Sequence, residues 1–226
     1  MNDSDVKLSK TLSYFLRHAA GRVSGKSPVP SIDSEGFASV DSLLSLPQLR
    51  SYSFADIERV VRTNDKQRFA LVNRASQADS NPSQTSGWYI RANQGHTFNV
   101  PGLELKLITI DQAAKYGHDV VHASFIRNWP LVKEHGLSRM SREHIHFLPH
   151  WPTREQRQRI SGKLRNADLF IFIDLKKAAE DGYTFYISAN NVILCPGDDR
   201  GIIDKKYFVR VISGSDDDKM NVLPLD

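Results

Sequence analysis

The chain contains very little cysteine: Cys195 is the single thiol among its 226 residues. One thiol cannot form an intramolecular disulfide and cannot supply a cysteine-based zinc cage, which suits a reducing compartment. The sequence also lacks any apolar run that approaches the roughly 20 residues of a membrane span. We therefore expect a protein of the cytoplasm or the nucleus that makes no contact with a membrane.

Glycine-rich nucleotide signatures are absent as well. The chain has no GxGxxG run and no GxxxxGKS/T run, which argues against a dinucleotide-binding Rossmann unit and against a P-loop. The glutamates are scattered, and none forms a recognisable acid–base pair. The formal net charge of +4 suits an anionic partner but also an ordinary surface, so charge alone does not identify a function.

The first part of the chain has the pattern of a small helical lobe with a hairpin. Apolar spacing predicts helices over residues 6–19, 40–49 and 54–62. Two β-type runs, 68–72 and 88–91, follow and are separated by a polar loop. Helices followed by a two-stranded hairpin are the outline of a winged-helix module, and such modules commonly, though not always, bind nucleic acid.

The rest of the chain predicts a mixed sheet lobe. Strands are expected at 119–122, 145–148, 169–174, 185–187, 191–194 and 207–211, with helices near 127–134 and 153–167. The tail over 213–219 includes three consecutive aspartates and is expected to be disordered. We therefore expect an α+β protein with one lobe over residues 1–100 and a second over residues 101–226.

Three arginines and a histidine are the first candidates for chemistry. A guanidinium group stays charged and can bind two phosphate oxygens at once, so Arg17, Arg68 and Arg142 would form a phosphate clamp if the fold brings them together. Each arginine alone is more often a salt-bridged surface residue. His18 follows Arg17, and its position suits phosphate binding, proton transfer or simple capping of a helix C-terminus.

A polar run follows the second hairpin strand. Arg91, Asn93, Gln94 and His96 offer directional donors and acceptors, and Gly95 permits a tight turn or a close backbone approach. The run is interpreted either as an RNA-binding loop or as a hydrogen-bonded loop after a strand. Guanidinium and imidazole groups beside small or apolar neighbours indicate an enzyme that acts on a phosphorylated, nucleic-acid substrate.

Histidines also occur in the second lobe. His122 ends an apolar strand before Ala123 and Ser124, where it can bind a ribose hydroxyl or serve the structure. His144 and His146 would share one face of a strand, but no carboxylate or cysteine arrangement completes a metal site, so no metal is expected.

With these motifs in this order, the chain resembles the NAD-dependent RNA 2′-phosphotransferases over nearly its whole length. The resemblance is carried by residues 8–13, 16–18, 63–69, 90–96, 136–137, 140–142, 145–146, 181–183 and 188–192. It implies a winged-helix RNA lobe followed by an ADP-ribosyltransferase-like NAD lobe. The catalytic set of the family maps onto Arg17, His18, Arg68 and Arg142.

The resemblance also implies which residues contact NAD, the consumed co-substrate. These are His122, Ala123, Ser124, His146, Ser188 and Asn191. The family usually has His-Gly-Thr where this chain has His122-Ala123-Ser124, so the additional methyl of Ala123 is expected beside NAD and would weaken its binding.

The implied reaction removes the splice-junction 2′-phosphate of tRNA. The phosphate first attacks C1″ of NAD⁺ and expels nicotinamide; the ribose 2″-hydroxyl then attacks phosphorus and leaves ADP-ribose 1″,2″-cyclic phosphate. The expected partners are tRNA or another 2′-phosphorylated RNA, and the protein is expected to be a monomer. Two alternatives remain at this point: a transferase that caps terminal nucleic-acid phosphates, and an inert winged-helix RNA-binding protein.

Overall fold

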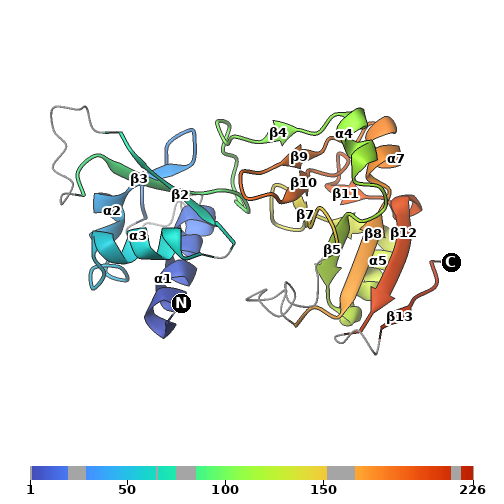
Figure 1. Cartoon of the computed structure of the whole chain (residues 1–226), viewed down its shortest axis with the longest axis horizontal. Coiled ribbons are helices and arrows are strands. Elements are labelled where there is room, and N and C mark those ends of the chain that lie inside the picture. The colour runs from blue at the N-terminus through green and yellow to red at the C-terminus, as the bar shows by residue number, and fades with distance from the viewer. Residues whose placement is uncertain are drawn as a thin grey trace. The chain divides into compact units, whose positions relative to one another are not determined.

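The computed structural model describes residues 2–19, 29–64, 66–74, 85–151, 166–214 and 220–225. The chain divides into two compact units, Met1–Glu104 and Leu105–Asp226 (Figure 1). Both units combine helices with antiparallel sheets, which confirms the α+β class. Most of the loop expected between the hairpin strands, most of the helix expected over 153–167 and most of the acidic tail lie outside the described residues.

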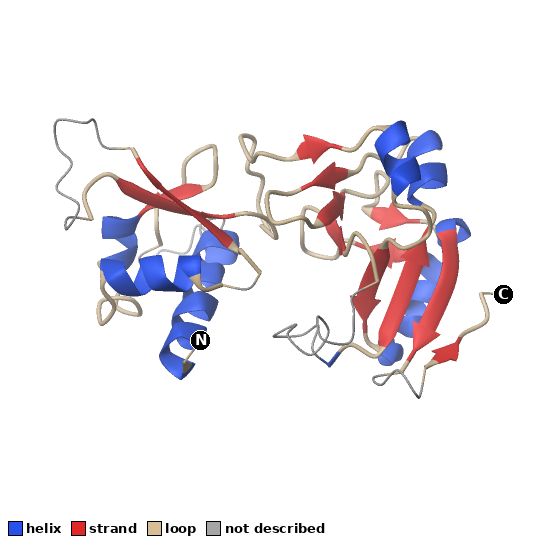
Figure 2. Cartoon of the chain, in the orientation of Figure 1, coloured by secondary structure: helices blue, strands red, loops and turns tan. Residues whose placement is uncertain are grey.

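The first unit places helices against one face of a small sheet (Figure 2). Its elements are α1 (Asp3–Tyr14), the π-helical turn η1 (Phe15–Ala19), β1 (Phe37–Ser39), α2 (Val40–Leu44), α3 (Phe54–Arg62), β2 (Phe69–Asn73) and β3 (Trp88–Ala92). The strands form an antiparallel sheet in the order β1-β3-β2. Ile90 of the central strand pairs with Ala38 and Leu71, and all three contribute to the core formed with Leu12 and Ile57.

Local sequence explains where these helices begin and end. A capping box starts α3, since the Ser53 hydroxyl and the Asp56 carboxylate each accept a backbone N–H of the other residue. The helix expected over 40–49 ends at Leu44 instead. Pro47 explains the early end, because proline cannot donate a helical hydrogen bond and disfavours helix at the residue before it. The predicted hairpin is confirmed as β2 and β3, and β1 adds an unexpected third strand.

The described residues of the second unit form two four-stranded sheets and one short strand pair. Its helical elements are α4 (Ile110–Lys115), η2 (Ile126–Asn128), α5 (Trp129–His135), α7 (Leu175–Glu180) and η4 (Lys205–Tyr207). Its strands are β4 (Lys106–Leu107), β5 (Val121–Ser124), β6 (Leu137–Ser138), β7 (Ile145–Phe147), β8 (Leu169–Ile173), β9 (Tyr186–Ile187), β10 (Ile193–Cys195), β11 (Ile202–Ile203), β12 (Phe208–Ser213) and β13 (Asn221–Val222). The sheets have the orders β4-β9-β10-β7 and β13-β12-β8-β5, and β6 pairs with β11.

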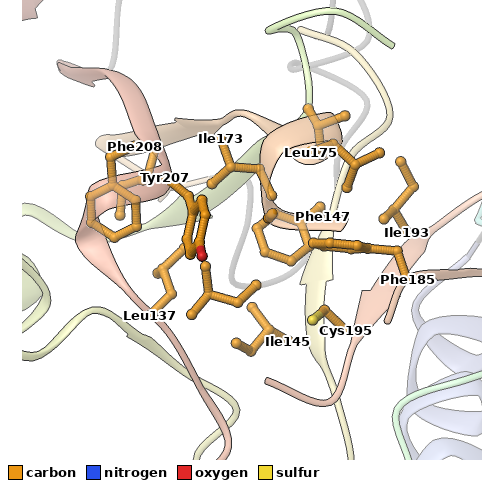
Figure 3. Packing of buried hydrophobic residues seen from close by; sticks show 14 of the residues in the cluster. Leu137, Ile145, Phe147, Ile173, Leu175, Phe185, Ile193, Cys195, Tyr207 and Phe208 are labelled. Carbon is orange, nitrogen blue, oxygen red and sulfur yellow. The ribbon is translucent and has the colours of Figure 1, made fainter. Parts of the chain in front are cut away.

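The main core of this unit lies between the two larger sheets. Figure 3 shows Phe147 of one sheet packed near Ile173 of the other, with Phe185 next to Phe147 and Ile193 next to Phe185. Both faces of β8 are covered, because Phe170 and its neighbours pack on a second apolar cluster. Complete burial on two faces explains why this strand is a continuous apolar run.

The two sheets meet where β5 lies beside β7. Val121 and Leu148 exchange two backbone hydrogen bonds, of 3.0 and 2.9 Å, in an isolated antiparallel bridge. Residues on β5 and β7 are therefore brought together although they are more than twenty positions apart in the sequence. Among the described residues, no helix combines the length and the apolar character that a bilayer crossing requires.

The predicted strands of this lobe are confirmed, with shifts of one or two residues at their ends. The helix expected near 127–134 is confirmed as α5, preceded by the short turn η2. The segment before His118, for which no helix or strand was predicted, contains β4 and α4. A capping box between Thr109 and Gln112 starts α4, and this short polar signal was missed.

Candidate functional site

Arg17 and His18 lie on the π-helical turn η1, directly after α1. Thr97 holds this turn: its backbone N–H and its hydroxyl both donate to the Arg17 carbonyl oxygen, at 2.9 and 3.1 Å. Nδ1 of His18 lies 3.4 Å from the same hydroxyl oxygen. Single π-helical turns occur frequently at functional sites. The sequence predicted the Arg-His pair but gave no sign that Thr97 fixes it.

The Arg17 side chain lies beside Gly95 of the loop after β3. As expected for a tight turn, Gly95 has a positive φ of +88°, which a residue with a Cβ adopts only with strain. A Cβ built there would lie 3.6 Å from Cδ, Nε and Cζ of Arg17. The 93–97 loop therefore contacts both the side chain of Arg17 and the backbone carbonyl oxygen of Arg17.

Arg68 is held by the buried side chain of Asn64. Oδ1 of Asn64 accepts from the backbone N–H of Arg68 at 3.4 Å and from its Nη1 at 3.2 Å. Nδ2 of Asn64 donates to the hydroxyl of Ser9 on α1, at 3.3 Å. Asn64 is only 3% exposed, so this polar chain links the interior of the unit to the guanidinium group.

Replacing Asn64 tests whether this chain orients Arg68. We expect Asn64→Ala to lower kcat about fivefold, because losing the hydrogen bond to Nη1, worth about 1 kcal/mol, frees the guanidinium group. Ser9→Ala removes only the distant bond, so it should lower the melting temperature but leave kcat close to wild type. Equal losses of kcat in the Ser9 and Asn64 variants would contradict the assignment.

Asn93 joins the same region from the loop after β3. Its Nδ2 donates to the Gln67 carbonyl oxygen at 2.6 Å, and its backbone N–H donates to the Arg68 carbonyl oxygen at 2.8 Å. Its Oδ1 is buried and has no hydrogen-bond donor among the described residues. A buried carbonyl oxygen without a donor is costly, and this one suits an O–H or N–H of a ligand. The loop thus brings Arg17, Arg68 and Asn93 into one region.

Arg91 is engaged inside the unit. Its guanidinium carbon lies 4.7 Å from the ring centre of Phe37, and Nη2 makes a 2.9 Å ion pair with Glu104. His96 is buried with its ring edge-on to Phe98, whereas Gln94 is half-buried. These contacts give Arg91 and His96 structural roles, and RNA binding by any of the three stays a prediction.

His122 and His146 meet at the junction of β5 and β7. Nδ1 of His122 lies 2.9 Å from the carbonyl oxygen of His146, and its ring is edge-on to Phe147. A carbonyl oxygen only accepts, so Nδ1 carries the hydrogen and Nε2 of the neutral ring is an acceptor. Burial lowers the pKa of His122 below 6.5, the positive charge of Arg142 lowers it further, and the His146 carbonyl opposes both.

The charge effect of Arg142 on His122 can be measured directly. We expect the imidazole resonance of His122 to titrate below pH 6.5, and Arg142→Ala to raise its midpoint because one nearby positive charge is removed. Two-dimensional NMR titration of both proteins gives the comparison, with His122→Gln used to assign the resonance. A midpoint that does not move in Arg142→Ala would mean that the two side chains are not neighbours.

Arg142 itself is exposed and ends a tight turn that begins at Arg139. The two units thus hold the predicted catalytic residues in two groups. Arg17, His18 and Arg68 belong to the first unit, and Arg142 belongs to the second with His122.

Ala123 faces away from His122. Its methyl packs on the cluster that contains Phe170, whereas the His122 ring contacts Phe147 of the main core. This packing gives no support to the expected contact between the methyl and NAD; a contact through the backbone stays a prediction. Ser124 Oγ accepts from Nδ2 of Asn128 at 3.1 Å, so its hydroxyl hydrogen stays able to donate.

Ser188 and Asn191 form the turn between β9 and β10. The Ser188 hydroxyl lies 2.9 Å from Oδ1 of Asn190 and accepts the Val192 N–H at 3.1 Å. Asn191 has a positive φ of 58°. Both residues shape the turn, and contact with NAD stays a prediction. In the register of this sheet Leu194 pairs with His146, so the turn adjoins the end of β7.

Neither a reactive thiol nor a metal cluster is found in the described part of the chain. Burial raises the pKa of Cys195 to about 12, which keeps the thiol protonated at neutral pH. No group of three or more His, Cys, Asp or Glu side chains among the described residues is arranged to hold a metal ion.

Comparison with known proteins gives one consistent family. Residues 3–197 match the family model described as RNA 2′-phosphotransferase, Tpt1 / KptA family. The tRNA 2′-phosphotransferase 1 of Danio rerio is 43% identical over 206 residues, which cover 91% of this chain and 84% of that protein. The Homo sapiens protein of the same name is also 43% identical, with 91% and 75% covered. The tRNA 2′-phosphotransferase of Saccharomyces cerevisiae is 32% identical, with 75% and 69% covered. Both the family match and these identities show that the chain belongs to the RNA 2′-phosphotransferase family.

Proposed function

We propose that this protein removes the splice-junction 2′-phosphate from tRNA and consumes NAD⁺ as its co-substrate. Family membership supports the reaction. The observation that carries it to these residues is the grouping of Arg17 and Arg68 around the 93–97 loop, together with the pairing of His122 and His146. The first group suits an anionic phosphate, and the second suits the hydroxyls of a nucleotide ribose.

The fold is consistent with a division of labour between the units. The described residues of the first unit form the helices α1, α2 and α3, the π-helical turn η1 and a small antiparallel sheet. This is the content of a winged-helix module, and the unit would bind RNA. The second unit would be the ADP-ribosyltransferase-like lobe that binds NAD⁺. Neither assignment follows from fold alone, because similar folds carry unrelated functions.

The first chemical step needs positioning more than acid–base catalysis. The RNA 2′-phosphate is already an anion when it attacks C1″ of NAD⁺, and nicotinamide leaves as the bond to C1″ forms. Arg17, Arg68 and His18 would hold this phosphate and align it, and alignment alone can account for a large part of a rate enhancement. Nε2 of neutral His122 would accept a hydrogen bond from a ribose hydroxyl of NAD⁺.

The second step moves the phosphate from RNA to ADP-ribose. The ribose 2″-hydroxyl attacks phosphorus and loses its proton, and the RNA 2′-oxygen leaves and gains one. Charge grows on the phosphate oxygens in this step, where Arg142 would stabilise it. His18 is the candidate for proton transfer, because imidazole is the side chain that most often acts as a general acid or base. The products are RNA with a 2′-hydroxyl and ADP-ribose 1″,2″-cyclic phosphate.

An oligonucleotide with one internal 2′-phosphate tests the proposal. Incubation with NAD⁺ should produce the 2′-hydroxyl RNA, nicotinamide and the cyclic phosphate, resolved by gel electrophoresis and mass spectrometry. A matched oligonucleotide that carries only a 5′-phosphate tests the capping alternative, since a cap would keep ADP-ribose on the RNA. Absence of NAD⁺-dependent phosphate loss would contradict the proposal, and RNA binding without nicotinamide release would favour an inert RNA-binding protein.

Cytoplasmic or nuclear location and the monomeric state stay predictions.

The packing of Ala123 leads to a further prediction. Because its methyl lies on the cluster opposite His122, we expect Ala123→Gly to leave the NAD⁺ concentration for half-maximal rate within about twofold of wild type. The melting temperature should fall, since glycine within a strand costs roughly 0.5–1 kcal/mol and the apolar contact is lost. Steady-state titration of NAD⁺ and thermal denaturation measure the two effects. A clearly lower NAD⁺ requirement in the variant would place the methyl beside the nucleotide.

A further inference from the structure

Two hydrogen bonds between Arg139 and Arg142 close the turn that carries Arg142. Nη1 of Arg139 donates to the carbonyl oxygen of Arg142 at 2.6 Å. The backbone N–H of Arg142 donates in return to the carbonyl oxygen of Arg139 at 3.1 Å. Two bonds in opposite directions fix the backbone from which the Arg142 side chain extends.

Arg139 is itself anchored on the loop before β11. Its backbone N–H donates to the Gly201 carbonyl oxygen at 2.9 Å. Its side chain lies across Gly201, where a Cβ would come within 2.4 Å of Nε and 2.8 Å of Cγ. That loop is held by hydrogen bonds of its own, because Oδ1 of Asp198 accepts the N–H groups of Arg200 and Ile202 at 3.0 and 2.9 Å. The guanidinium group of Arg139 thus connects a fixed loop to the carbonyl of Arg142.

The same turn brings positive charge to the histidines of this unit. The charge of Arg142 acts on His122, and the charge of Arg139 acts on His144, which faces Tyr186. A small movement of the turn would therefore change the distances from both guanidinium groups to these histidines. The hydrogen bond from Arg139 to the Arg142 carbonyl oxygen opposes such a movement.

We infer that Arg139 is a positioning residue for Arg142, and that its hydrogen bond to the Arg142 carbonyl holds the Arg142 guanidinium where charge develops in the second step. This rests on the proposed function for its kinetic consequence. Arg139 would contact neither RNA nor NAD⁺, so its loss should act through Arg142. The first step, which does not depend on Arg142, should proceed almost normally.

Arg139→Met is the most direct variant, because methionine keeps an unbranched apolar stem for Gly201 but removes the donor to Arg142. Single-turnover assays with 2′-phosphorylated RNA and NAD⁺ follow the ADP-ribosylated RNA as it forms and decays. We expect decay to slow about tenfold and formation to change less than about twofold. Arg139→Met combined with Arg142→Ala should decay no more slowly than Arg142→Ala alone, since coupled residues are not additive.

Arg200→Ala is the matched control. Arg200 belongs to the same loop, its side chain is 73% exposed, and its ion pair is with Asp198. Its replacement should leave both steps close to wild type. Additive effects in the double variant, or equal slowing of both steps in Arg139→Met, would overturn the inference even though the wild-type enzyme completes the reaction.

A second measurement does not depend on activity. In Arg139→Met the midpoint of the His122 imidazole titration should move in the same direction as in Arg142→Ala, because the Arg142 charge is no longer held near His122. Arg200→Ala should leave that midpoint in place. An unchanged His122 midpoint in folded Arg139→Met would overturn the inference. If the wild-type protein releases no phosphate with NAD⁺, the proposed function fails, and this titration still decides whether Arg139 positions Arg142.

Discussion

Arg17→Ala and Arg68→Ala are each expected to lower the rate of 2′-phosphate removal by about a hundredfold. A guanidinium group directed at a phosphate oxyanion in the transition state is typically worth on the order of 3 kcal/mol. Arg17 also contacts Gly95, and Arg68 is oriented by Asn64, so each group is preorganised before RNA binds. Rates under single-turnover conditions at saturating RNA and NAD⁺ measure this effect.

Both variants should remain folded. The Arg17 contact that holds η1 uses its backbone carbonyl, which alanine retains. Arg62→Ala is a suitable control, since Arg62 is an exposed residue in the last turn of α3, and it should keep a rate close to wild type. Wild-type rates in a folded Arg17 or Arg68 variant would remove that residue from the catalytic set.

Arg142→Ala is expected to separate the two chemical steps. Its guanidinium group is assigned to charge that develops when phosphorus is attacked, so the second step should slow about a hundredfold while the first changes little. ADP-ribosylated RNA should then accumulate and be visible as a slower band on a denaturing gel. Mass spectrometry of that band identifies it.

Arg127→Ala gives a control in the same unit, because Arg127 is exposed and packs over Phe125, away from the Arg139–Arg142 turn in sequence. It should show no intermediate. If Arg142→Ala slows both steps equally and no intermediate appears, Arg142 contributes to binding in general and not to the second step.

Sequence periodicity predicted the longer elements well for a physical reason. The bounds of α3 match the predicted range 54–62, because a capping box, a regular apolar face and a following polar turn all agree. The apolar run of β8 was equally clear. The strands β1, β4, β6 and β11 have only two or three residues each. Such short segments have no measurable period, and pairing with distant strands decides their conformation.

Sequence motifs identified the candidate site residues, but they did not identify the residues that hydrogen-bond to them. Thr97 bonds to Arg17 across 80 positions, and Asn64 bonds to Ser9 across 55. Nothing in the local sequence reveals such long-range hydrogen bonds. The direction of the Ala123 methyl likewise depends on the register of β5 against β8, which pairs Ala123 with Phe170. A one-residue change of register would have reversed it.

The hydrogen bond between His122 and the His146 carbonyl crosses the joint between two sheets. The orientation of the His122 imidazole therefore depends on how the two sheets pack against each other. Phe147 contacts this ring and also belongs to the main core. We therefore expect conservative core changes such as Phe147→Leu to lower activity in a mutational scan by more than their loss of folding stability explains. Core residues at the junction of β5 and β7 would then be classed as functional residues, although they contact no substrate.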